Sequence, residues 1–541
     1  MNNILNTGRL ALVRNIKIRC SFDKAYVLDN AAIEKAVKLI KTTKLFNFIS
    51  EKQAFVYKKS VDAREKKEIF LVYTIAFPII DKIDFNTLKG VDIVEISNPE
   101  NMFVTNKKTS KRPLVVGFGP SGMFCALSLA KAGLSPVVIE RGEDIDKRAL
   151  SVENYWKHGE LNAESNVQFG EGGAGTFSDG KLLTRISDKL CNYVLSEFVK
   201  HGAPDEIMYL AKPHIGTDNL RNIVKNIRKE IVELGGSVRF GTKLEAVETD
   251  SNNRITACIL SGGERIECDS VFLCLGHSAR DTVLKLRDCG VRVEPKPFSV
   301  GLRIEHLRQK IDEALYGSFA GCDSLGSASY TLSRKLDGRA VYSFCMCPGG
   351  VVVASASENG QIVTNGMSYY SRDGVNSNSA IAVSVDTSDY GNTVEGAIDF
   401  QHSIEKKAFI CAGGQGAAPV QLLGDFLDDT LLCEPSRILP TYTGKTSMVK
   451  VDDVLPKFVS QKLRDGIVMF ERDIEGFCDS NAVLTFPETR TSSPVKIPRD
   501  EHYLAIGFKN LYPCGEGAGY AGGITSAAVD GIRCALSYLN S

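Results

Sequence analysis

The chain has 541 residues and a formal net charge of zero, because 65 Lys and Arg residues balance 65 Asp and Glu residues. This length predicts two or three domains, and the charge balance argues against a nucleic-acid binder or a membrane-surface protein. No apolar run reaches the roughly 18 residues needed to cross a bilayer, and the start of the chain lacks the basic and apolar regions of a signal peptide. We therefore expect a soluble, cytoplasmic protein whose fifteen cysteines are reduced and lack metal-type spacing.

The first 104 residues are predicted to form a small α+β domain of their own. Apolar periodicity predicts strands at 15–22, 54–60 and 69–77 and a helix at 31–41. The basic stretch at 58–67 is either a solvated edge or a docking surface. The polar, basic segment 105–112 is expected to be a linker.

Residues 113–142 carry the central pattern, PLVVGFGPSGMFCALSLAKAGLSPVVIERG. An apolar strand leads into a G-x-G-x-x-G turn and a helix, and a second strand ends at Glu140. In such a βαβ unit the first glycine makes the turn, the second lets a pyrophosphate approach, and the third packs helix on strand. The helix N-terminus faces the phosphates, and the acidic residue accepts from a ribose hydroxyl. The unit predicts an adenine dinucleotide and leaves FAD and NAD both open.

A second glycine-rich stretch occupies residues 164–185, ESNVQFGEGGAGTFSDGKLLTR. Its glycines, with Thr176, Ser178 and Lys181 among them, favour a loop whose backbone faces a planar or anionic ligand over an ordinary turn. Later, a buried strand at 270–275 ends at Gly276 and His277. We expect this strand to return to the dinucleotide, with His277 as either a ligand contact or a hydrogen-bonded loop residue.

From about residue 291 to 505, many short strands with few long helices predict an inserted, mostly β substrate domain. Alternation on a strand places Arg303 and Glu305 on one face and His306 on the other. The spacing of Cys345 and Cys347 puts both thiols on one strand face, where packing is favoured over a redox dithiol.

The segment 511–539 returns to a strand, a glycine-rich turn and a helix that begins near Thr525. Glu516 follows the strand, where a carboxylate suits the hydroxyls of a ribityl chain. NAD enzymes do not need this element, so the two ends of the chain together favour FAD. The predicted fold is α/β: a Rossmann-like FAD-binding domain at 113–290 and 506–541, an inserted mostly-β substrate domain at 291–505, a linker at 105–112, and a small α+β domain at 1–104.

These motifs resemble a family of bacterial FAD-dependent dehydrogenases, through GFGPSGMF, ERG, ESNVQFGEGGAGTFSDGKL, GLRIEH, CMCPGGVVV, NGMSYYSRDG, ETRTSSPV and GEGAGYAGGITSAAVDG. The match runs from the SVDAR segment to the last helix. More distantly, the chain is similar to flavoproteins with a glutathione-reductase-type FAD domain. The resemblance implies non-covalent FAD but does not fix a substrate. The FAD contacts expected are Gly117, Gly119, Pro120, Ser121, Gly122, Glu140, Arg141, Gly172, Gly173, Ala174, Gly175, Thr176, Val247, Gly276, Gly515, Glu516, Gly523, Ile524 and Ser526.

We therefore expect an FAD-dependent oxidoreductase, a dehydrogenase or reductase, that exchanges a hydride with a small organic substrate. The candidate catalytic residues are Lys181, His306, Arg490 and Ser492. Arg490 is expected to clamp a carboxylate and His306 to carry a proton. NAD(P)H enters only as a transient donor, because one complete βαβ unit is visible.

Two alternatives remain: a flavin-bearing binding or redox-sensing protein whose FAD is structural or regulatory, and an oxygen-dependent hydroxylase. The expected partner is a small-molecule substrate, with no nucleic acid, membrane or metal. The sequence specifies no oligomeric state.

Overall fold

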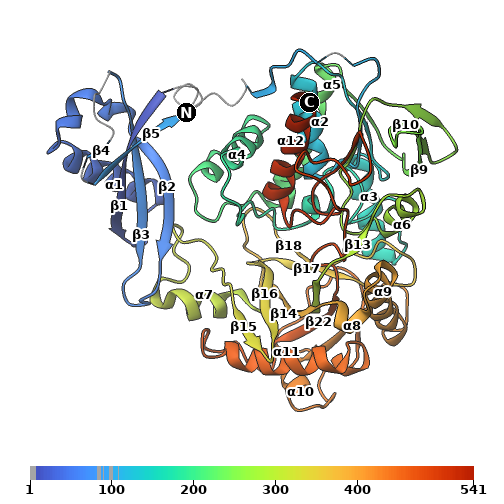
Figure 1. Ribbon diagram of the computed structural model, residues 1–541. Coiled ribbons are helices and arrows are strands. Elements are labelled where there is room, and N and C mark those ends of the chain that lie inside the picture. The colour runs from blue at the N-terminus through green and yellow to red at the C-terminus, as the bar shows by residue number, and fades with distance from the viewer. Residues whose placement is uncertain (1–7, 82–86, 89, 97–101, 108) are drawn as a thin grey trace. The chain divides into compact units, whose positions relative to one another are not determined.

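The computed structural model describes residues 8–81, 87–88, 90–96, 102–107 and 109–541 (Figure 1). The start of the chain, where no signal peptide is expected, and Lys108 of the predicted linker lie outside the described residues. The chain divides into two compact units. Unit 1 comprises residues 1–104, 204–213 and 309–328, and unit 2 comprises 105–203, 214–308 and 329–541. The two short segments of unit 1 lie within regions predicted as parts of the FAD-binding and substrate domains.

Unit 1 is a five-stranded antiparallel sheet with one long helix packed against it. Its strands, in the order β2-β3-β1-β5-β4, are β1 (Gly8–Arg19), β2 (Phe55–Asp62), β3 (Phe70–Pro78), β4 (Thr87–Leu88) and β5 (Val91–Ile96). Helix α1 (Ala25–Ile40) buries Leu28, Ala32 and Ala36 at the four-residue spacing of one helix face. Lys59 of β2 exchanges backbone hydrogen bonds with Tyr209 and Ala211, at 2.7 and 2.8 Å, which ties segment 204–213 to the sheet edge.

Unit 2 contains a five-stranded sheet in which all neighbouring strands are parallel. In the order β24-β12-β6-β7-β8, its strands are β6 (Leu114–Val116), β7 (Val137–Ile139), β8 (Ser237–Arg239), β12 (Val271–Leu273) and β24 (Leu511–Pro513). Strands β6 and β7 are joined by helix α2 (Pro120–Lys131), which forms the βαβ unit predicted from the sequence. The strand from the far C-terminus pairs with β12, so the two ends of unit 2 share one sheet.

The parallel sheet lies between two layers. Helices α2, α5 (Gly216–Glu233) and α12 (Ile524–Leu539) pack together on one face. On the other face, a three-stranded antiparallel sheet of β9 (Leu244–Thr249), β10 (Ile255–Leu260) and β11 (Arg265–Glu267) shares a hydrophobic core with it. The short apolar strands β6 and β12 are buried throughout, because layers cover both their faces.

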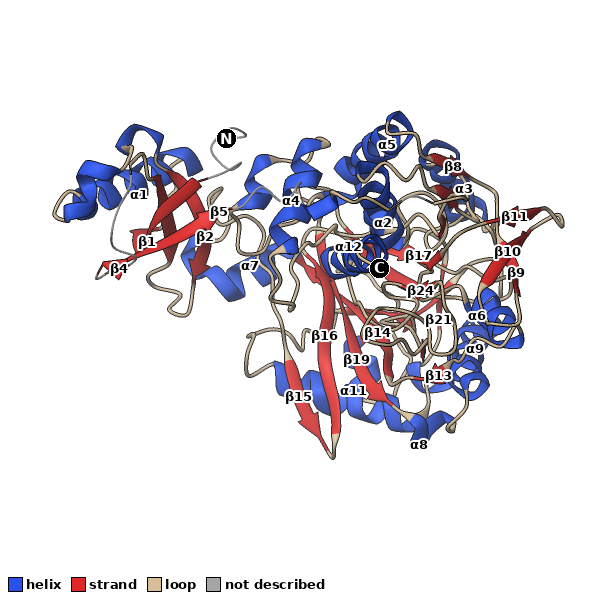
Figure 2. Ribbon diagram, turned by 45° about the horizontal axis from the view of Figure 1, so that its top comes forward, coloured by secondary structure: helices blue, strands red, loops and turns tan. Residues whose placement is uncertain are grey.

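The rest of unit 2 is built on a seven-stranded sheet (Figure 2). In the order β15-β16-β19-β14-β22-β20-β21, its strands are β14 (Phe298–Leu307), β15 (Ser333–Leu336), β16 (Arg339–Cys347), β19 (Asn376–Val385), β20 (Ala418–Leu422), β21 (Thr446–Met448) and β22 (Val483–Glu488). Two further pairs are β13 (Glu294–Pro295) with β23 (Val495–Lys496) and β17 (Val351–Ala354) with β18 (Thr364–Met367). Helix α11 (Lys457–Phe470) packs on β14, β15, β16 and β19, and α9 (Val394–Cys411) packs on β20 and β22. Two long helices therefore belong to a region whose sequence predicted few.

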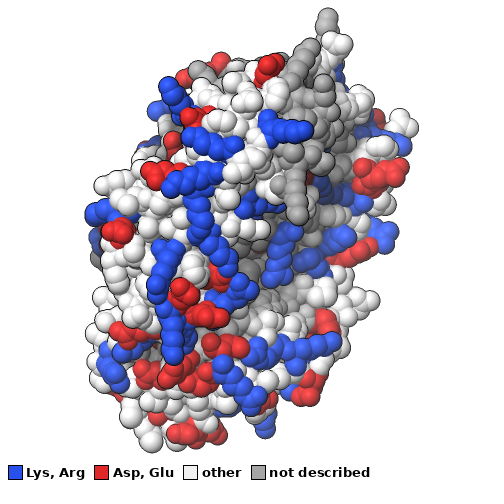
Figure 3. All heavy atoms as spheres, turned by 90° about the vertical axis from the view of Figure 1, so that its left-hand side faces the viewer, with Lys and Arg blue, Asp and Glu red and all other residues white. Residues whose placement is uncertain are grey.

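The other α-helices are shorter or peripheral: α3 (Ile145–His158), α4 (Leu190–Lys200), α6 (Arg280–Asp288), α7 (Arg308–Tyr316), α8 (Thr387–Tyr390) and α10 (Leu423–Leu427). The described part of the predicted linker is tied to α12: Thr105 Oγ1 donates to the Leu539 carbonyl at 3.0 Å and Lys107 Nζ to that of Tyr538 at 2.7 Å. Among the described residues, no helix combines the length and the apolar composition of a membrane span. Basic side chains lie among acidic ones on the face shown in Figure 3.

Candidate functional site

A cavity of about 340 Å³ opens in unit 2 at the carboxyl ends of the parallel strands. Its wall includes Gly117 after β6, Glu140 after β7, Leu275 after β12 and Glu516 after β24. In open parallel sheets, ligands bind outside the carboxyl ends of the strands, where helices leave in different directions. The seven-stranded region adds Phe344, Cys345, Asn365, Gly366 and Arg490 to the wall.

The glycines of the β6–α2 turn have distinct geometric roles. Gly117 has φ +101°, and a Cβ there would stand 2.5 Å from the Cys274 carbonyl oxygen. A Cβ on Gly122 would collide with the Gly117 carbonyl oxygen, so Gly122 allows the helix to pack on the turn. Gly119 is different: the nearest atom to a Cβ there is the Gly173 Cα at 3.6 Å, an ordinary contact. Gly119 lines the cavity, whereas Gly122 is absent from the described lining.

The first turn of α2 offers polar groups to this cavity. Its leading N–H groups have no intrahelical partner, as at every helix start, and Pro120 occupies the first helical position. The Ser121 hydroxyl is buried in the cavity wall without a hydrogen-bond partner among the described residues. An orphaned hydroxyl beside unpaired N–H groups is a suitable environment for a bound anion.

Glu140 is held by backbone groups. Its Oε1 accepts hydrogen bonds from the amides of Gly142 and Gly170, both at 2.9 Å, and its Oε2 accepts from the Phe118 amide at 2.8 Å. The side chain is 5% exposed and lines the cavity. Because Oε2 has one such donor, it keeps a lone pair for a hydroxyl from the cavity.

The neighbouring Arg141 is held in the cavity wall by two carboxylates and an aromatic ring. Its guanidinium donates to Glu164 at 2.8 Å and to Asp281 at 2.8 and 3.1 Å, and it lies over the Phe169 ring at 4.0 Å from the centroid. These acidic partners raise the pKa of Arg141 although burial opposes them.

The glycine-rich loop at 164–185 is organised by Arg148 of α3, which the sequence analysis did not single out. Arg148 is fully buried and donates four hydrogen bonds to backbone carbonyls of the loop. The acceptors are the carbonyls of Asn166, Val167, Glu171 and Gly173, at 2.6–3.0 Å. A Cβ on Gly170 would collide with the Arg148 side chain, which explains that glycine. No local pattern distinguishes such an arginine from the exposed basic residues of α3.

Most of the residues predicted to contact FAD surround the cavity, but six do not. The predicted residues in the described lining are Gly117, Gly119, Pro120, Ser121, Glu140, Arg141, Gly173, Ala174, Gly175, Gly276, Glu516, Gly523 and Ile524. Those absent from it are Gly122, Gly172, Thr176, Val247, Gly515 and Ser526.

The structure gives another role to four of these absent residues: Thr176, Val247, Gly515 and Ser526. Val247 packs in the core of the three-stranded sheet, and Lys243 and Leu244 line the cavity in its place. The Thr176 carbonyl accepts from Thr217 at 2.6 Å. A Cβ on Gly515 would stand 2.8 Å from that of Ser121, so Gly515 supports the wall. Ser526 Oγ donates to the Gly523 carbonyl at 3.1 Å, within its own helix start.

Of the four candidate catalytic residues, Lys181 and Arg490 line the cavity, while His306 and Ser492 are absent from the described lining. His306 is 2% exposed in β14, its Nε2 lies 2.8 Å from the Phe477 carbonyl, and its ring packs on that of Phe477. Burial lowers its pKa. The expected proton carrier is therefore a packed sheet residue. Ser492 is half-buried beside Thr491, which does line the cavity.

Arg490 is engaged by a buried carboxylate. Glu405 accepts from Arg490 Nε at 3.0 Å and Nη2 at 2.9 Å, and also from Arg280 at 2.8 Å. Burial alone would raise the pKa of Glu405, but the two guanidinium groups hold it well below its usual range. The bidentate fork expected to clamp a substrate carboxylate is thus occupied by a residue of the chain.

On the same wall, Lys181 Nζ lies 3.4 Å from Asp179 and donates to the Met346 carbonyl. Asp179 also accepts from Arg372 Nε at 2.9 Å. Glu516 differs from these groups, because its carboxylate has no hydrogen-bond or ion-pair partner among the described residues. Burial raises the pKa of Glu516 to about 7, and Lys296 opposes that shift.

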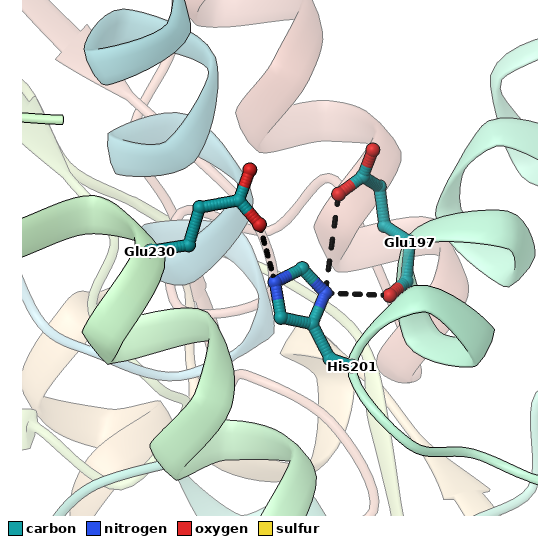
Figure 4. Close-up of side chains that lie close together, drawn as sticks. All are labelled: Glu197, His201 and Glu230. Carbon is teal, nitrogen blue, oxygen red and sulfur yellow. Dashed lines mark hydrogen bonds and ion pairs between the residues drawn. The ribbon is translucent and has the colours of Figure 1, made fainter. Parts of the chain in front are cut away.

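A second cluster, Glu197, His201 and Glu230, has ligand atoms close enough to hold a metal ion (Figure 4). Both ring nitrogens of His201 face acceptors: the Glu197 carbonyl and the Glu230 carboxylate, each at 2.6 Å. Lys131 donates to Glu197 at 2.6 Å and Lys200 to Glu230 at 2.7 Å. Because a metal would have to displace these cations, we interpret the cluster as an ion-pair network joining α4 to α5.

Comparison with known proteins places the chain in a family. Residues 297–491 match the family described as FAD-dependent protein, C-terminal domain-like. An uncharacterised protein of Clostridium beijerinckii is 46% identical over 487 residues, which cover 89% of this chain and 91% of that protein. Several solved structures resemble the chain more weakly, with TM-scores below 0.5. They include L-amino acid deaminase from Proteus vulgaris (10% identity, TM-score 0.33, covering 79% of this chain and 94% of that one) and the flavin-dependent brominase Bmp2 (11%, 0.37, 79% and 79%). The protein belongs to the same family as the Clostridium beijerinckii protein and carries, at residues 297–491, the C-terminal domain of FAD-dependent proteins.

Proposed function

We propose that this protein is an FAD-dependent oxidoreductase that transfers a hydride between FAD and a small organic substrate. The observation that carries the proposal is the composition of one cavity wall. That wall combines a glycine turn and an acidic residue at parallel strand ends with polar residues of the seven-stranded region. The first set suits a dinucleotide, and the second offers a place for a substrate.

The chain's own groups fit FAD at several points. Gly119 leaves room for a pyrophosphate, and the Ser121 hydroxyl and the N–H groups of α2 are free to donate to it. Glu140 would accept from a ribose hydroxyl, and the unpaired Glu516 from a hydroxyl of the ribityl chain. Gly523 and Ile524, at the start of α12, line the same cavity.

Bound FAD would supply the hydride chemistry, and the chain would orient and shield the substrate. Lys181 is the polar group best suited to hold a substrate oxygen, because Asp179 and the Met346 carbonyl engage two of its three N–H donors. Asp179 raises the pKa of Lys181 although burial opposes it, so the amine is charged at neutral pH. Arg490, locked by Glu405, would shape the wall and add positive charge.

A nicotinamide donor would dock transiently. Among the described residues, the strand pairings contain one five-stranded parallel sheet, and its switch point is the site proposed for FAD. We therefore expect no second preformed dinucleotide domain in the described part of the chain.

A flavin-bearing binding or redox-sensing protein is the competing function. Unit 1, with its own core and the basic stretch at 58–67, would then recognise a partner. Sustained turnover of a reductant and acceptor pair separates an enzyme from a sensor, which changes state once per reduction.

The test is purification followed by anaerobic titration with candidate reductants. We expect yellow protein that releases FAD on denaturation and a subset of reductants that bleach the bound flavin. A folded protein that neither retains nor takes up FAD would overturn the proposal. Bleaching without turnover by any acceptor would favour the sensing role.

A further inference from the structure

Cys345 and Cys347 lie in β16, and their side chains stay within hydrogen-bonding reach although the strand is irregular between them. The pairing of β16 with β19 shifts between Phe344 and Cys347, so the strand carries a bulge there. Cys345 has φ +44°, a left-handed conformation that is uncommon for a residue other than glycine. Bulges redirect side chains, often beside functional sites. Cys345 lines the cavity and is half-buried, whereas Cys347 is fully buried behind it.

We propose that Cys345 and Cys347 form a redox-active dithiol in the cavity wall, with Cys345 as the nucleophile and a low-molecular-weight disulfide as the substrate. The Cys347 thiol donates to the Cys345 carbonyl at 3.2 Å, which keeps it beside its neighbour. Because Cys345 lines a cavity of about 340 Å³, a small disulfide suits it better than a folded protein.

The surroundings of Cys345 stabilise a thiolate. Lys181 approaches from the glycine-rich loop, and Arg303 of β14 donates to the Cys345 carbonyl at 3.2 Å. Two acidic groups oppose them: Asp179, which is shared with Lys181 and Arg372, and Glu488, which is paired with Arg303 at 2.9 Å. A hydrogen bond from Cys347, with Lys181 and Arg303, holds the pKa of Cys345 below its ordinary range although burial opposes them. Thiolates, not thiols, are the reactive species.

The reaction balances without any other cofactor. The Cys345 thiolate attacks one sulfur of R–S–S–R, forms a mixed disulfide and releases one R–S⁻. The Cys347 thiol gives its proton to R–S⁻ and attacks the Cys345 sulfur, which forms the Cys345–Cys347 disulfide and releases the second R–S⁻. In total, two electrons pass from the dithiol to R–S–S–R, which becomes one thiol and one thiolate, and the thiolate takes a proton from solvent. A thiol reductant reverses both steps.

The first test is alkylation of the purified protein by iodoacetamide, followed by peptide mapping. The exposed Cys411 and Cys433 are internal references. Between pH 6 and pH 8, the rate for an ordinary thiol rises by about 80-fold, because its thiolate fraction rises. We expect less than about a threefold rise at Cys345, and at least a tenfold steeper profile in Lys181→Met. A Cys345 profile parallel to that of Cys433 would overturn the activated thiolate.

The second test is treatment with 2-hydroxyethyl disulfide and mapping without reduction. We expect a Cys345–Cys347 link in the wild type, a mixed disulfide on Cys345 in Cys347→Ser, and an unmodified Cys347 in Cys345→Ser. Modification confined to Cys411 and Cys433 in the wild type would establish simple strand packing instead. A mixed disulfide on wild-type Cys345 without the link would overturn the role of Cys347.

The wild-type result stands even if a variant misfolds. Flavin content, recorded separately, tests the proposed function, so the two proposals can fail independently.

Discussion

Gly122 packs so closely on Gly117 that no side chain fits between the start of α2 and the turn that precedes it. Gly119, between them in the sequence, lines the cavity, and a Cβ there would make only an ordinary contact with Gly173. One motif therefore contains a glycine required for packing and a glycine required for access. The two requirements can be separated by mutation.

We expect Gly122→Ala to lower the free energy of unfolding by about 1–3 kcal/mol or more, because the new methyl group overlaps backbone. Gly119→Ala should leave stability nearly unchanged, since its Cβ makes an ordinary 3.6 Å contact at negative φ. It should nevertheless weaken FAD binding by occupying space beside the pyrophosphate. Urea unfolding and FAD titration of both variants test this. If Gly119→Ala bound FAD as tightly as the parent, the proposed position of the pyrophosphate beside Gly119 would be wrong.

Arg148 should be more important for the glycine-rich loop than any residue within it. Arg148→Met removes four hydrogen bonds and leaves buried carbonyls unpaired, so we expect a loss of about 3–5 kcal/mol and faster proteolysis within 164–185. Lys147→Met is the matched control, because its side chain on the same helix is 73% exposed. Equal proteolysis rates in the two variants would contradict this role for Arg148.

Glu516 predicts a pH dependence with a definite sign. Burial raises its pKa to about 7 from 4.5, so the folded state binds the proton more tightly than the unfolded chain. Below about pH 4.5 the carboxyl is protonated in both states, so it does not lower the free energy of unfolding. As pH rises from about 4.5 through about 7, ionisation lowers the free energy of unfolding, and above that range the loss is complete. Without added FAD, we expect Glu516→Gln to match the parent at pH 4.5 and to exceed its stability by about 1–3 kcal/mol at pH 8.

The control for Glu516→Gln is Glu501→Gln, whose side chain is 88% exposed. It should show no difference at either pH. A Glu516→Gln variant that is equally stable to the parent at pH 8 would mean that the carboxylate finds a partner or water.

The sequence predicted the parts of the site that depend on local spacing. Gly117, Gly119 and Glu140 belong to a contiguous strand–turn–helix–strand unit, whose geometry follows from periodicity and glycine placement. Glu516 was found for the same reason, because a strand and a glycine-rich turn precede a helix there.

The errors concern residues whose role depends on distant partners. Strand alternation could not show that Phe477 would cover His306, or that a bulge would leave Cys345 in the cavity wall and bury Cys347. Arg148 was missed because its acceptors are backbone carbonyls, which carry no residue-type signal. Arg490 was predicted to face the substrate. The sequence could not show that Glu405, which lies 85 residues earlier, accepts hydrogen bonds from its guanidinium group.

The Arg490–Glu405 pair gives the last prediction, which separates a substrate clamp from a wall component. Glu405 is completely buried between Arg280 and Arg490, so Glu405→Gln leaves two buried cations without their shared carboxylate. We expect a loss of about 3–5 kcal/mol. Arg490→Met should cost less, because Arg280 still pairs with Glu405, and the double variant should be less unstable than the sum of the two losses. Urea unfolding of the four proteins measures this coupling. If Arg490 instead clamps a substrate carboxylate, Arg490→Met would be nearly as stable as the parent, and its KM for an acidic substrate would rise steeply.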